Sequence, residues 1–488
     1  MSSGTEVQTS GTVRAADSSK LRLGALTALV VGSMIGGGIF SLPQNMAASS
    51  GAGSIVIAWA ITFVGMLTLA FVFQNLANRK PEIEGGVYGY ARAGFGDYIG
   101  FNSAWGYWIS AWIGNVSYMV VFFSALGAFG ALSFFGEGNT LPAIIAASLL
   151  LWGLHTLILR GVQSATFINT ITTIAKLVPL ALFVVIVIFA FNIKTFNTDF
   201  WGSPALGSVI NQVKGSMLVT VWVFIGIEGA SVFSSRAESM KEVGKATVIG
   251  FLLTITLLVA VSLLSMGVLT QAELAHLKNP STASVLKAAI GPWGATLINV
   301  GLVISVGGAL LAWTLLAAEI PYLAGKDGIF PKVFGKLNAN GSPAAALWLT
   351  NGLVQLFLVI TLFSSAGYLA LLSLATSMIL IPYLLCGLYA LVVAMRGEGY
   401  PAGDAARNKD ILIGLIASVY GVWLIYAAGP TYLFLSMVLY APGVLFYLKA
   451  KSEHGEKPFK GFEAVIAAVV VVLGIYAAYL LANGAIRI

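Results

Sequence analysis

The chain has 488 residues and a formal net charge of +7; 58% of its residues are hydrophobic and 9% are charged. Soluble domains carry about 25% charged residues, so this composition and a mean hydropathy of +0.90 exclude a soluble globular protein and indicate an integral membrane protein. The apolar runs are continuous rather than alternating, which favours membrane-spanning helices over a barrel. A single cysteine, Cys386, excludes an intrachain disulfide and offers no metal cluster.

Residues 1–20 are polar and rich in Ser, Thr and Gly, and they contain no apolar stretch before a cleavage site. We interpret them as a disordered cytoplasmic tail rather than a signal peptide. Thirteen apolar segments follow, each long enough to cross a bilayer. They lie near residues 23–48, 54–78, 98–133, 141–159, 167–191, 209–234, 243–269, 291–324, 343–363, 366–395, 410–428, 430–448 and 462–485.

The last segment stands apart from the others. A stretch rich in Lys, Glu, Gly and Pro, residues 449–461, precedes it and is interpreted as a cytoplasmic hinge. Residues 21–448 are therefore expected to form a twelve-helix body, and residues 462–488 an additional C-terminal transmembrane helix.

The distribution of Lys and Arg predicts the orientation, because cytoplasmic loops carry an excess of these residues. With the N-terminus inside, 20 of the 26 Lys and Arg residues lie in internal segments and five lie outside, namely Lys194, Lys214, Lys278, Lys287 and Arg487. The one that remains, Lys176, lies within a span. This bias predicts thirteen crossings with the N-terminus inside and the C-terminus outside, and it explains the net charge without a nucleic-acid partner.

The first apolar segment contains three consecutive glycines, Gly36 to Gly38, within the stretch Gly-Ser-Met-Ile-Gly-Gly-Gly-Ile-Phe at 32–40. Each glycine costs about 1 kcal/mol relative to alanine in a helix. Irregular backbone at membrane depth is tolerated only where protein covers it or where it lines a polar cavity. The glycines therefore favour a helix interrupted in mid-membrane, whose free amides suit an anion. The alternative is that they only allow another helix to pack closely.

The sixth segment has a second interruption of the same kind. Gly226 and Gly229 flank an acid, Glu228, within Val-Trp-Val-Phe-Ile-Gly-Ile-Glu-Gly-Ala-Ser-Val at 221–232. Segments one and six occupy matching places if residues 23–191 and 209–395 are two five-span repeats, and an odd number of spans inverts the second repeat. Such a pair indicates a midplane transport site. We therefore expect an all-α membrane fold with a five-plus-five inverted repeat and discontinuous helices one and six.

Several motifs resemble the basic amino acid/polyamine antiporters of the amino acid–polyamine–organocation transporters. Singly they are weak, but their order along nearly the whole chain is specific. They are Gly-Gly-Gly-Ile-Phe at 36–40, Glu-Gly-Gly-Val-Tyr at 84–88, Tyr-Trp at 107–108, Trp-Ile-Gly-Asn at 112–115, Trp-Val-Phe-Ile-Gly-Ile-Glu at 222–228, Trp-Thr-Leu-Leu at 313–316, Asp-Gly-Ile-Phe-Pro at 327–331 and Pro-Tyr at 382–383.

The resemblance implies a secondary transporter that exchanges cationic amino acids across the cytoplasmic (inner) membrane by alternating access, and it is strongest to arginine/ornithine exchangers. Amides near Gly37 and Gly38, at the start of a half-helix, suit the substrate carboxylate. Carbonyls freed around Met34, Trp222 and Ile225 suit its α-ammonium. The family's arginine/agmatine members have serine where this chain has Gly37, so one hydroxyl contact is absent here.

Trp222 and Trp313 are expected to contact the cationic side chain of the substrate, a contact that contributes about 0.5–2 kcal/mol. For any one tryptophan the alternative is that it faces lipid or anchors an interface. The resemblance also places Asn115, Tyr107 and Tyr383 in the side-chain pocket and gate. The candidate substrate-binding residues are Met34, Gly37, Gly38, Tyr107, Ala111, Asn115, Trp222, Ile225, Trp313 and Tyr383.

Two further positions depart from the family pattern. Tyr118 stands one helical turn from Asn115, where relatives can carry methionine, and Ala375 stands where a relative uses serine to meet a guanidinium. These departures weaken the case for strict selection of a guanidinium group.

Ionisable residues within membrane segments are functional candidates because their burial in lipid is costly. Glu228 resembles the family's proximal gate and proton-responsive position. Glu319 either pairs with a cation or is a structural acid near the cytoplasmic end. Lys176 must neutralise, pair or contact freed carbonyls; we expect it to bridge spans one and five and make sodium unnecessary, as a lysine does in several members of the superfamily, with snorkelling as the alternative.

Other functions find less support in the sequence. No ring of charges predicts a channel, no signalling domain predicts a sensor, and no nucleophile–base or metal cluster predicts an enzyme. No cofactor and no metal are expected, and the partners are small cationic amino acids and the lipid bilayer, with a homodimer left open. Residues 328–335 are interpreted as an amphipathic helix on the inner surface. Within the transporter class, lysine/cadaverine, histidine/histamine and arginine/agmatine exchange and proton-coupled uptake remain alternatives.

Overall fold

The structure is a computed structural model, and it describes residues 23–83, 85–161, 165–228, 240–363 and 367–486. Within these ranges the regular structure is entirely helical. In the described part of the chain, eight helices are long and apolar enough to cross a membrane, and a ninth span is gained if the bent pair at the N-terminal end is counted as one. The predicted N-terminal tail, residues 1–20, lies outside the described residues.

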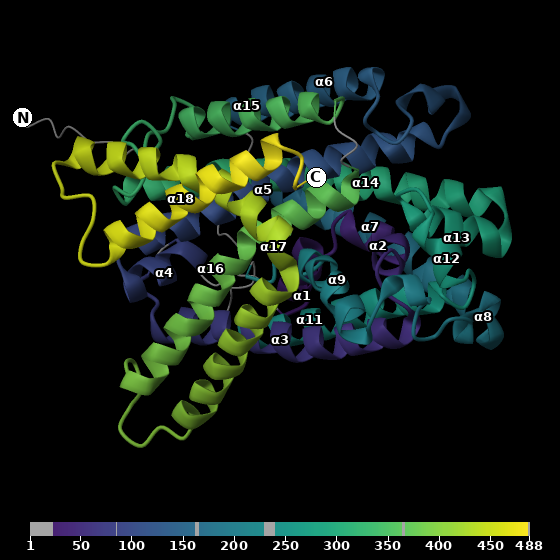
Figure 1. Ribbon diagram of the computed structural model, residues 1–488, viewed down its shortest axis with the longest axis horizontal. Coiled ribbons are helices and arrows are strands. Elements are labelled where there is room, and N and C mark those ends of the chain that lie inside the picture. Colours follow the sequence, from purple (N-terminus) through teal and green to yellow (C-terminus); the bar gives the residue numbers. More distant parts are fainter. Residues whose placement is uncertain (1–22, 84, 162–164, 229–239, 364–366, 487–488) are drawn as a thin grey trace, which may run out of the picture.

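The helices follow one another as a bundle of long rods joined by short connections (Figure 1). In the first part of the chain they are α1 Leu23–Met34, η1 Gly38–Ser41, α2 Leu42–Ala47, α3 Ala52–Arg79, α4 Val87–Phe95, α5 Asp97–Gly127, η2 Gly130–Phe135, α6 Leu141–Leu159, α7 Ala165–Ala190, α8 Ile193–Asn197, η3 Pro204–Leu206 and α9 Val209–Trp222. The second part contains α11 Met240–Ser265, α12 Gln271–Ala275, α13 Ser281–Ile290, α14 Pro292–Lys326, α15 Ala344–Ile360, α16 Tyr368–Arg396, α17 Ala406–His454 and α18 Glu463–Ala482.

Helix α17 contains two of the predicted spans. They meet at Gly429, whose φ of 73° and ψ of 169° are not helical, and the next residue, Pro430, lacks the N–H that would continue the ladder. Helix α15, Ala344–Ile360, has only 17 residues, whereas α7, Ala165–Ala190, has 26. The all-helical membrane fold is thus confirmed, whereas the number of thirteen crossings and the inverted repeat stay predictions.

The first span is broken where the glycines predicted a break. Helix α1 ends at Met34, η1 begins at Gly38, and the helices on the two sides of the break are inclined by 42°. The glycine-rich link between them is buried. Backbone groups are therefore freed inside the protein, where they are covered rather than exposed to lipid.

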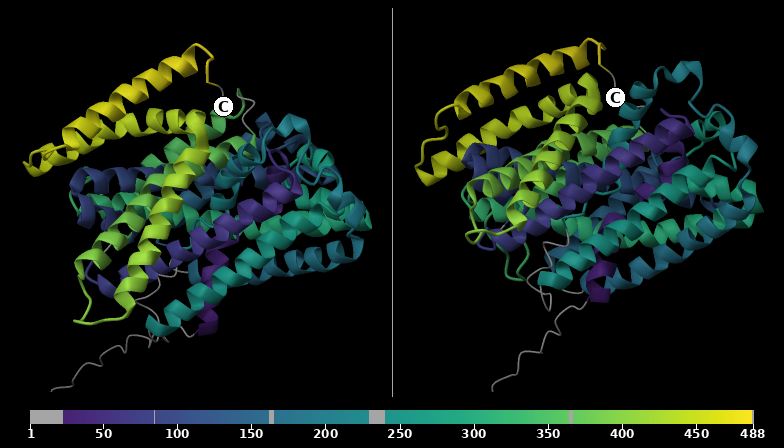
Figure 2. Two further views of the ribbon diagram at one scale, coloured as in Figure 1. Left: turned by 60° about the horizontal axis from the view of Figure 1, so that its bottom comes forward. Right: turned by 90° about the horizontal axis from the view of Figure 1, so that it is seen from below.

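Burial distinguishes the centre of the bundle from its edge. In α5, 89% of the apolar window is buried, against 17% in α18. Figure 2 shows α18 on the outside of the molecule, alongside the second half of α17. Helix α5 is thus placed to present residues to an internal site, whereas α18 lies at the periphery of the bundle.

Charged groups tie the end of α17 to the beginning of α5. The ammonium of Lys451 is 2.6 Å from Asp97 Oδ2 and 2.7 Å from Glu456 Oε2, and it lowers the pKa of the exposed Glu456 carboxyl. Helix α17 continues to His454, so the predicted hinge, 449–461, overlaps the last turns of this helix.

The predicted amphipathic helix at 328–335 is wrong. These residues form turns, and the N–H groups of Ile329 and Phe330 both donate to the Ala324 carbonyl at 3.0 Å. Both side chains are fully buried, and the Phe330 ring packs 5.3 Å from that of Phe101. Ile329 and Phe330 therefore anchor a turn in the core.

Candidate functional site

The two predicted breaks lie against each other. Ser33, beside the first break, donates its hydroxyl hydrogen to the Gly226 carbonyl at 3.0 Å. Gly226 has a φ of +107°, and a Cβ at this position would lie 2.7 Å from the Ser33 carbonyl oxygen. Only glycine suits both this backbone conformation and this approach. The sixth segment is described as far as Glu228; Gly229 and the rest of its expected second half lie outside the described residues.

The glycines of the first break permit close contact with aromatic side chains. A Cβ at Gly36 would overlap the Tyr118 hydroxyl, and one at Gly38 would lie 2.8 Å from the Trp222 ring. The far end of the Trp222 ring approaches α5: a Cβ at Gly114 would lie 3.1 Å from this ring. Trp222 is therefore inserted between the first break and α5. The close-packing alternative for the glycines and the broken-helix interpretation are both correct here.

A small cavity of about 10 Å³ lies at this point, which is about the space of one water molecule. It is lined by Ser110, Ala111, Gly114, Tyr118, Trp222, Ile225 and Trp313. Trp222 stands edge-on to Tyr118, with ring centroids 5.8 Å apart, and its Nε1–H donates to the Tyr368 hydroxyl at 3.3 Å. An amino acid can therefore occupy this place only after the surrounding helices have moved apart.

Tyr107 and Tyr383 are brought together by Glu228. The Tyr107 hydroxyl donates to Glu228 Oε1 at 2.6 Å, and the Tyr383 hydroxyl donates to Oε2 at 2.8 Å. The backbone N–H of Gly226 also donates to Oε2, at 3.2 Å. Glu228 is only 4% exposed. Helices α5 and α16 are thus joined to the second break through one buried carboxyl group.

Lys176 is 2% exposed and lies beside the first break. Its ammonium donates to the carbonyl oxygens of Gly32 at 2.6 Å and Ile35 at 2.5 Å. These are carbonyls near the end of α1, where the helical ladder stops. A cation is favourable at the C-terminal end of a helix because it complements the partial negative charge there. The side chain points into the protein, so it does not snorkel.

Asn115 is buried on α5, and neither its Oδ1 nor its Nδ2 has a hydrogen-bond partner among the described residues. Buried polar atoms normally have a partner. An unpaired amide one residue from Gly114, which contacts Trp222, is a place where a polar ligand would gain hydrogen bonds. Met34, Gly37 and Gly38 are also buried at the first break.

The predicted residues therefore do not all form one cavity. Ala111, Trp222, Ile225 and Trp313 line it, and Tyr107 and Tyr383 contact Glu228 instead. Glu319 is half-buried on α14, and within the described part of the chain no ion pair includes it. Likewise, no group of three His, Cys, Asp or Glu side chains in that part is placed to hold a metal.

The candidate substrate-binding residues leave out Ser110, Gly114 and Tyr118, which line the cavity, and Tyr368, which contacts Trp222. Ser110 lines the cavity and stands one helical turn before Gly114, so the α-helical spacing could have found it. Tyr368 receives the Trp222 hydrogen bond from the first residue of α16, and no pattern in the sequence signals that contact.

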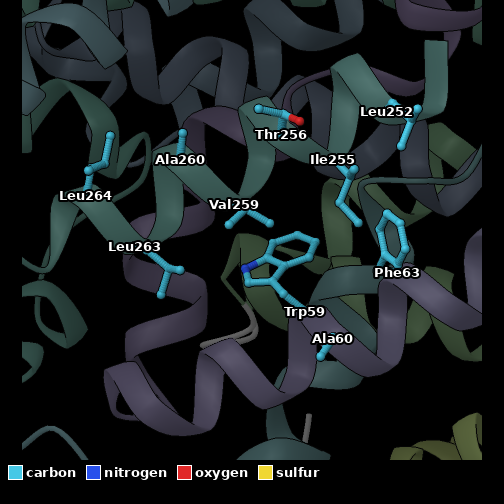
Figure 3. Close-up of a pocket in the computed structure, with 10 residues that line it drawn as sticks. All are labelled: Trp59, Ala60, Phe63, Leu252, Ile255, Thr256, Val259, Ala260, Leu263 and Leu264. Atoms are coloured by element: carbon cyan, nitrogen blue, oxygen red, sulfur yellow. The ribbon is translucent and has the colours of Figure 1, made fainter. Parts of the chain in front are cut away.

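A larger pocket lies elsewhere, between α3 and α11 (Figure 3). Its ten lining residues are almost all apolar, and none of them is a candidate site residue. The indole N–H of Trp59 in this pocket is already used, since it donates to the Ser262 hydroxyl at 2.8 Å. Thr256 adds a hydroxyl group, but none of the lining residues is charged.

Apolar spans, a broken first helix and a buried polar centre together define a multi-pass membrane transporter. Comparison with known proteins agrees: the model of the amino acid permease family matches residues 21–459. The chain belongs to this family.

Curated relatives cover almost the whole chain. An arginine/ornithine antiporter of Pseudomonas aeruginosa is 60% identical, over 96% of this chain and 98% of its own. An arginine/agmatine antiporter of Chlamydia pneumoniae is 43% identical, over 98% of this chain and 100% of its own. An L-lysine transport protein of Corynebacterium glutamicum is 41% identical, over 97% of each chain.

Proposed function

We propose that this protein exchanges cationic amino acids across the cytoplasmic membrane, with arginine and ornithine as the favoured pair. The observation that carries the proposal is the insertion of Trp222 between the first break and α5, where Trp313 lines the same cavity. The faces of tryptophan rings attract a guanidinium or ammonium group. The 60% identity to an arginine/ornithine antiporter supports this choice of pair.

In this proposal each end of the amino acid has a partner. The amides of Gly37 and Gly38 at the first break receive the carboxylate. The carbonyls near Met34, Trp222 and Ile225 receive the α-ammonium. The side chain extends toward Trp222 and Trp313, and Asn115 gains the hydrogen bonds that its amide lacks in the closed cavity.

Alternating access then follows from the two linked regions of the site. Because the cavity is too small for an amino acid, loading requires α9 and the first break to separate from α5. The Tyr107–Glu228–Tyr383 bridge is the gate that holds α5, α16 and the second break together on one side. Substrate that satisfies the freed backbone groups lowers the free energy of the closed state and permits reopening on the other side.

Lys176 replaces a metal ion in this scheme. Its side-chain nitrogen donates to the carbonyls of Gly32 and Ile35, the position at which a bound cation would stabilise the broken helix. Transport is therefore expected to proceed without sodium. We further propose that the N-terminus is inside, the C-terminus is outside and residues 23–191 and 209–395 are inverted repeats.

The same fold could support two other transport reactions. The 43% identity to an arginine/agmatine antiporter favours a decarboxylated exchange partner, which would not use the amides at Gly37 and Gly38. Proton-coupled uptake of one amino acid is the other, and it would require Glu228 or Lys176 to change its protonation state during transport.

The experiment uses purified protein in liposomes loaded with ornithine, agmatine, lysine, cadaverine, histamine or buffer alone. Labelled arginine is added outside, first without an imposed gradient and then with an acidic exterior. We expect rapid uptake only into ornithine-loaded vesicles. Equal uptake into agmatine-loaded vesicles would identify the decarboxylated partner, and efficient acid-driven uptake into empty vesicles would contradict obligatory exchange.

The glycines of the first break provide a sharp test of the packing. We expect Gly36→Ala to lower arginine exchange about tenfold, because the added methyl group overlaps the Tyr118 hydroxyl and overpacking costs about 1–3 kcal/mol. Gly352→Ala is the matched control: Gly352 lies in α15, outside the candidate site, and a Cβ there would meet nothing within 4 Å. This variant should keep most of the exchange rate. Adding Tyr118→Phe to Gly36→Ala should restore part of the activity, and equal effects of the two alanines would contradict the packing.

A further inference from the structure

A second polar pocket lies away from the candidate site, where the end of α5, the segment around α13 and the beginning of α14 meet. Its volume is about 470 Å³, within the usual range of small-ligand sites. Residues from all three elements contribute polar groups to it. Those that the argument uses are Glu137, Lys278, Asn279, Lys287 and Asn299.

The pocket contains unpaired hydrogen-bond acceptors. Asn299 lies on α14 and is only 3% exposed, yet its Oδ1 has no partner among the described residues, and the same holds for Asn279 Oδ1. Leaving a buried polar group unpaired costs about 1–3 kcal/mol. A ligand that donates hydrogen bonds, such as an ammonium or guanidinium group, would recover this cost.

Charges of both signs stand at the same pocket. Lys278 and Glu137 form an ion pair at 2.8 Å, and both side chains are largely exposed. Lys287 lines the pocket as well, and in the part of the chain that the structure describes no ion pair includes it. Lys287 suits a carboxylate, while Glu137 and the two amide oxygens suit cationic groups. A zwitterion with an additional positive charge matches this set of groups.

The pocket is also connected to the first break. Asn279 donates from Nδ2 to Gln44 Oε1 at 3.0 Å and to Asn45 Oδ1 at 3.1 Å, and both acceptors belong to α2, the half-helix after the break. On the other side, Ser124 of α5 donates to the Asn279 carbonyl at 2.5 Å. Asn279 thus links α2 to α5, and a ligand bound to Asn279 would contact this link.

We infer that this pocket is a second binding site, with Asn299 as its anchor, for α-amino acids that carry a cationic side chain. The inference rests on the proposed function, because it assigns the pocket the same class of ligand as the central site. Ligand bound here lies beside the half-helix that must move for loading, and it therefore forms a station between the solution and the central cavity.

Equilibrium binding of labelled arginine to the purified full-length protein tests this inference. We expect two bound arginines per chain in the unaltered protein. Asn299→Leu should weaken one of them at least tenfold, since leucine keeps the volume but removes the amide; folding should be preserved, because Asn299 Oδ1 has no partner to lose. Trp222→Leu should weaken the other. Asn197→Leu, at an exposed asparagine outside the pocket, is the matched control and should retain both.

The outcomes separate this inference from the proposed function. Arginine exchange in liposomes together with one bound arginine per chain, or with two that persist in Asn299→Leu, would overturn the second site and leave the exchanger intact. Neither exchange nor binding of arginine, ornithine or lysine by the unaltered protein would overturn the proposed function, and the second site with it.

Discussion

Replacing Lys176 with methionine is expected to lower arginine/ornithine exchange at least tenfold. Methionine keeps much of the length of the side chain but leaves the Gly32 and Ile35 carbonyls without their ammonium partner. Each buried group left unsatisfied costs about 1–3 kcal/mol, and about 1.4 kcal/mol corresponds to a factor of ten. The measurement is the initial rate of labelled arginine uptake into ornithine-loaded liposomes.

Lys194→Met is the control for this substitution, since Lys194 is exposed on α8 and its loss should leave exchange unchanged. The same assay with sodium replaced by choline tests whether Lys176 takes the place of a bound sodium ion. Unaltered protein should exchange equally in both salts. Normal exchange by Lys176→Met would show that the broken helix does not depend on this contact.

Replacing Glu228 with alanine should have a comparable or greater effect on exchange. This change removes the acceptor of two tyrosine hydroxyls and of the Gly226 N–H at once, and it leaves these donors buried. We expect at least a tenfold loss of the exchange rate, because the α5–α16 bridge no longer closes. Glu228→Gln keeps an acceptor oxygen and nearly the same volume, so it should fall between alanine and the unaltered protein.

A double-mutant cycle locates this effect in the gate. Tyr107→Phe and Tyr383→Phe each remove one hydrogen bond to Glu228, and their effects should be much smaller when Glu228 is already alanine. Additive losses in the combined variants would mean that the tyrosines act independently of Glu228. Exchange by Glu228→Gln measured across pH distinguishes a structural gate from a proton carrier: a proton carrier would lose its pH dependence on this substitution.

The sequence predicted the features whose physical cost is high. Three glycines within an apolar span and a lysine far from either interface both demand an explanation in a bilayer, and the structure brings Lys176 to the carbonyls beside the glycine break. Gly226 likewise marked the second break, where its positive φ permits contact with Ser33.

Features that depend on three-dimensional packing could not be found in the same way. The approach of Tyr368 to Trp222 joins residues 146 positions apart, and no local periodicity encodes such a contact. For residues 328–335 the sequence pattern suggested a surface helix that does not form. Ile329 and Phe330 are buried in a turn instead, and the Phe330 ring packs against the distant ring of Phe101. The meeting of Tyr107 and Tyr383 at one carboxyl group also required the assembled bundle.

The segment containing α12 and α13 is hydrogen-bonded to η1 and α2 at several points. Gln271 Nε2 donates to the Ala47 carbonyl at 2.7 Å, the Gln44 N–H donates to Ser281 Oγ at 3.0 Å, and Thr282 Oγ1 donates to the Phe40 carbonyl at 2.8 Å. We therefore expect the α12–α13 segment to move together with η1 and α2. An antibody fragment that binds this segment would then be expected to slow the whole transport cycle without occupying the substrate path.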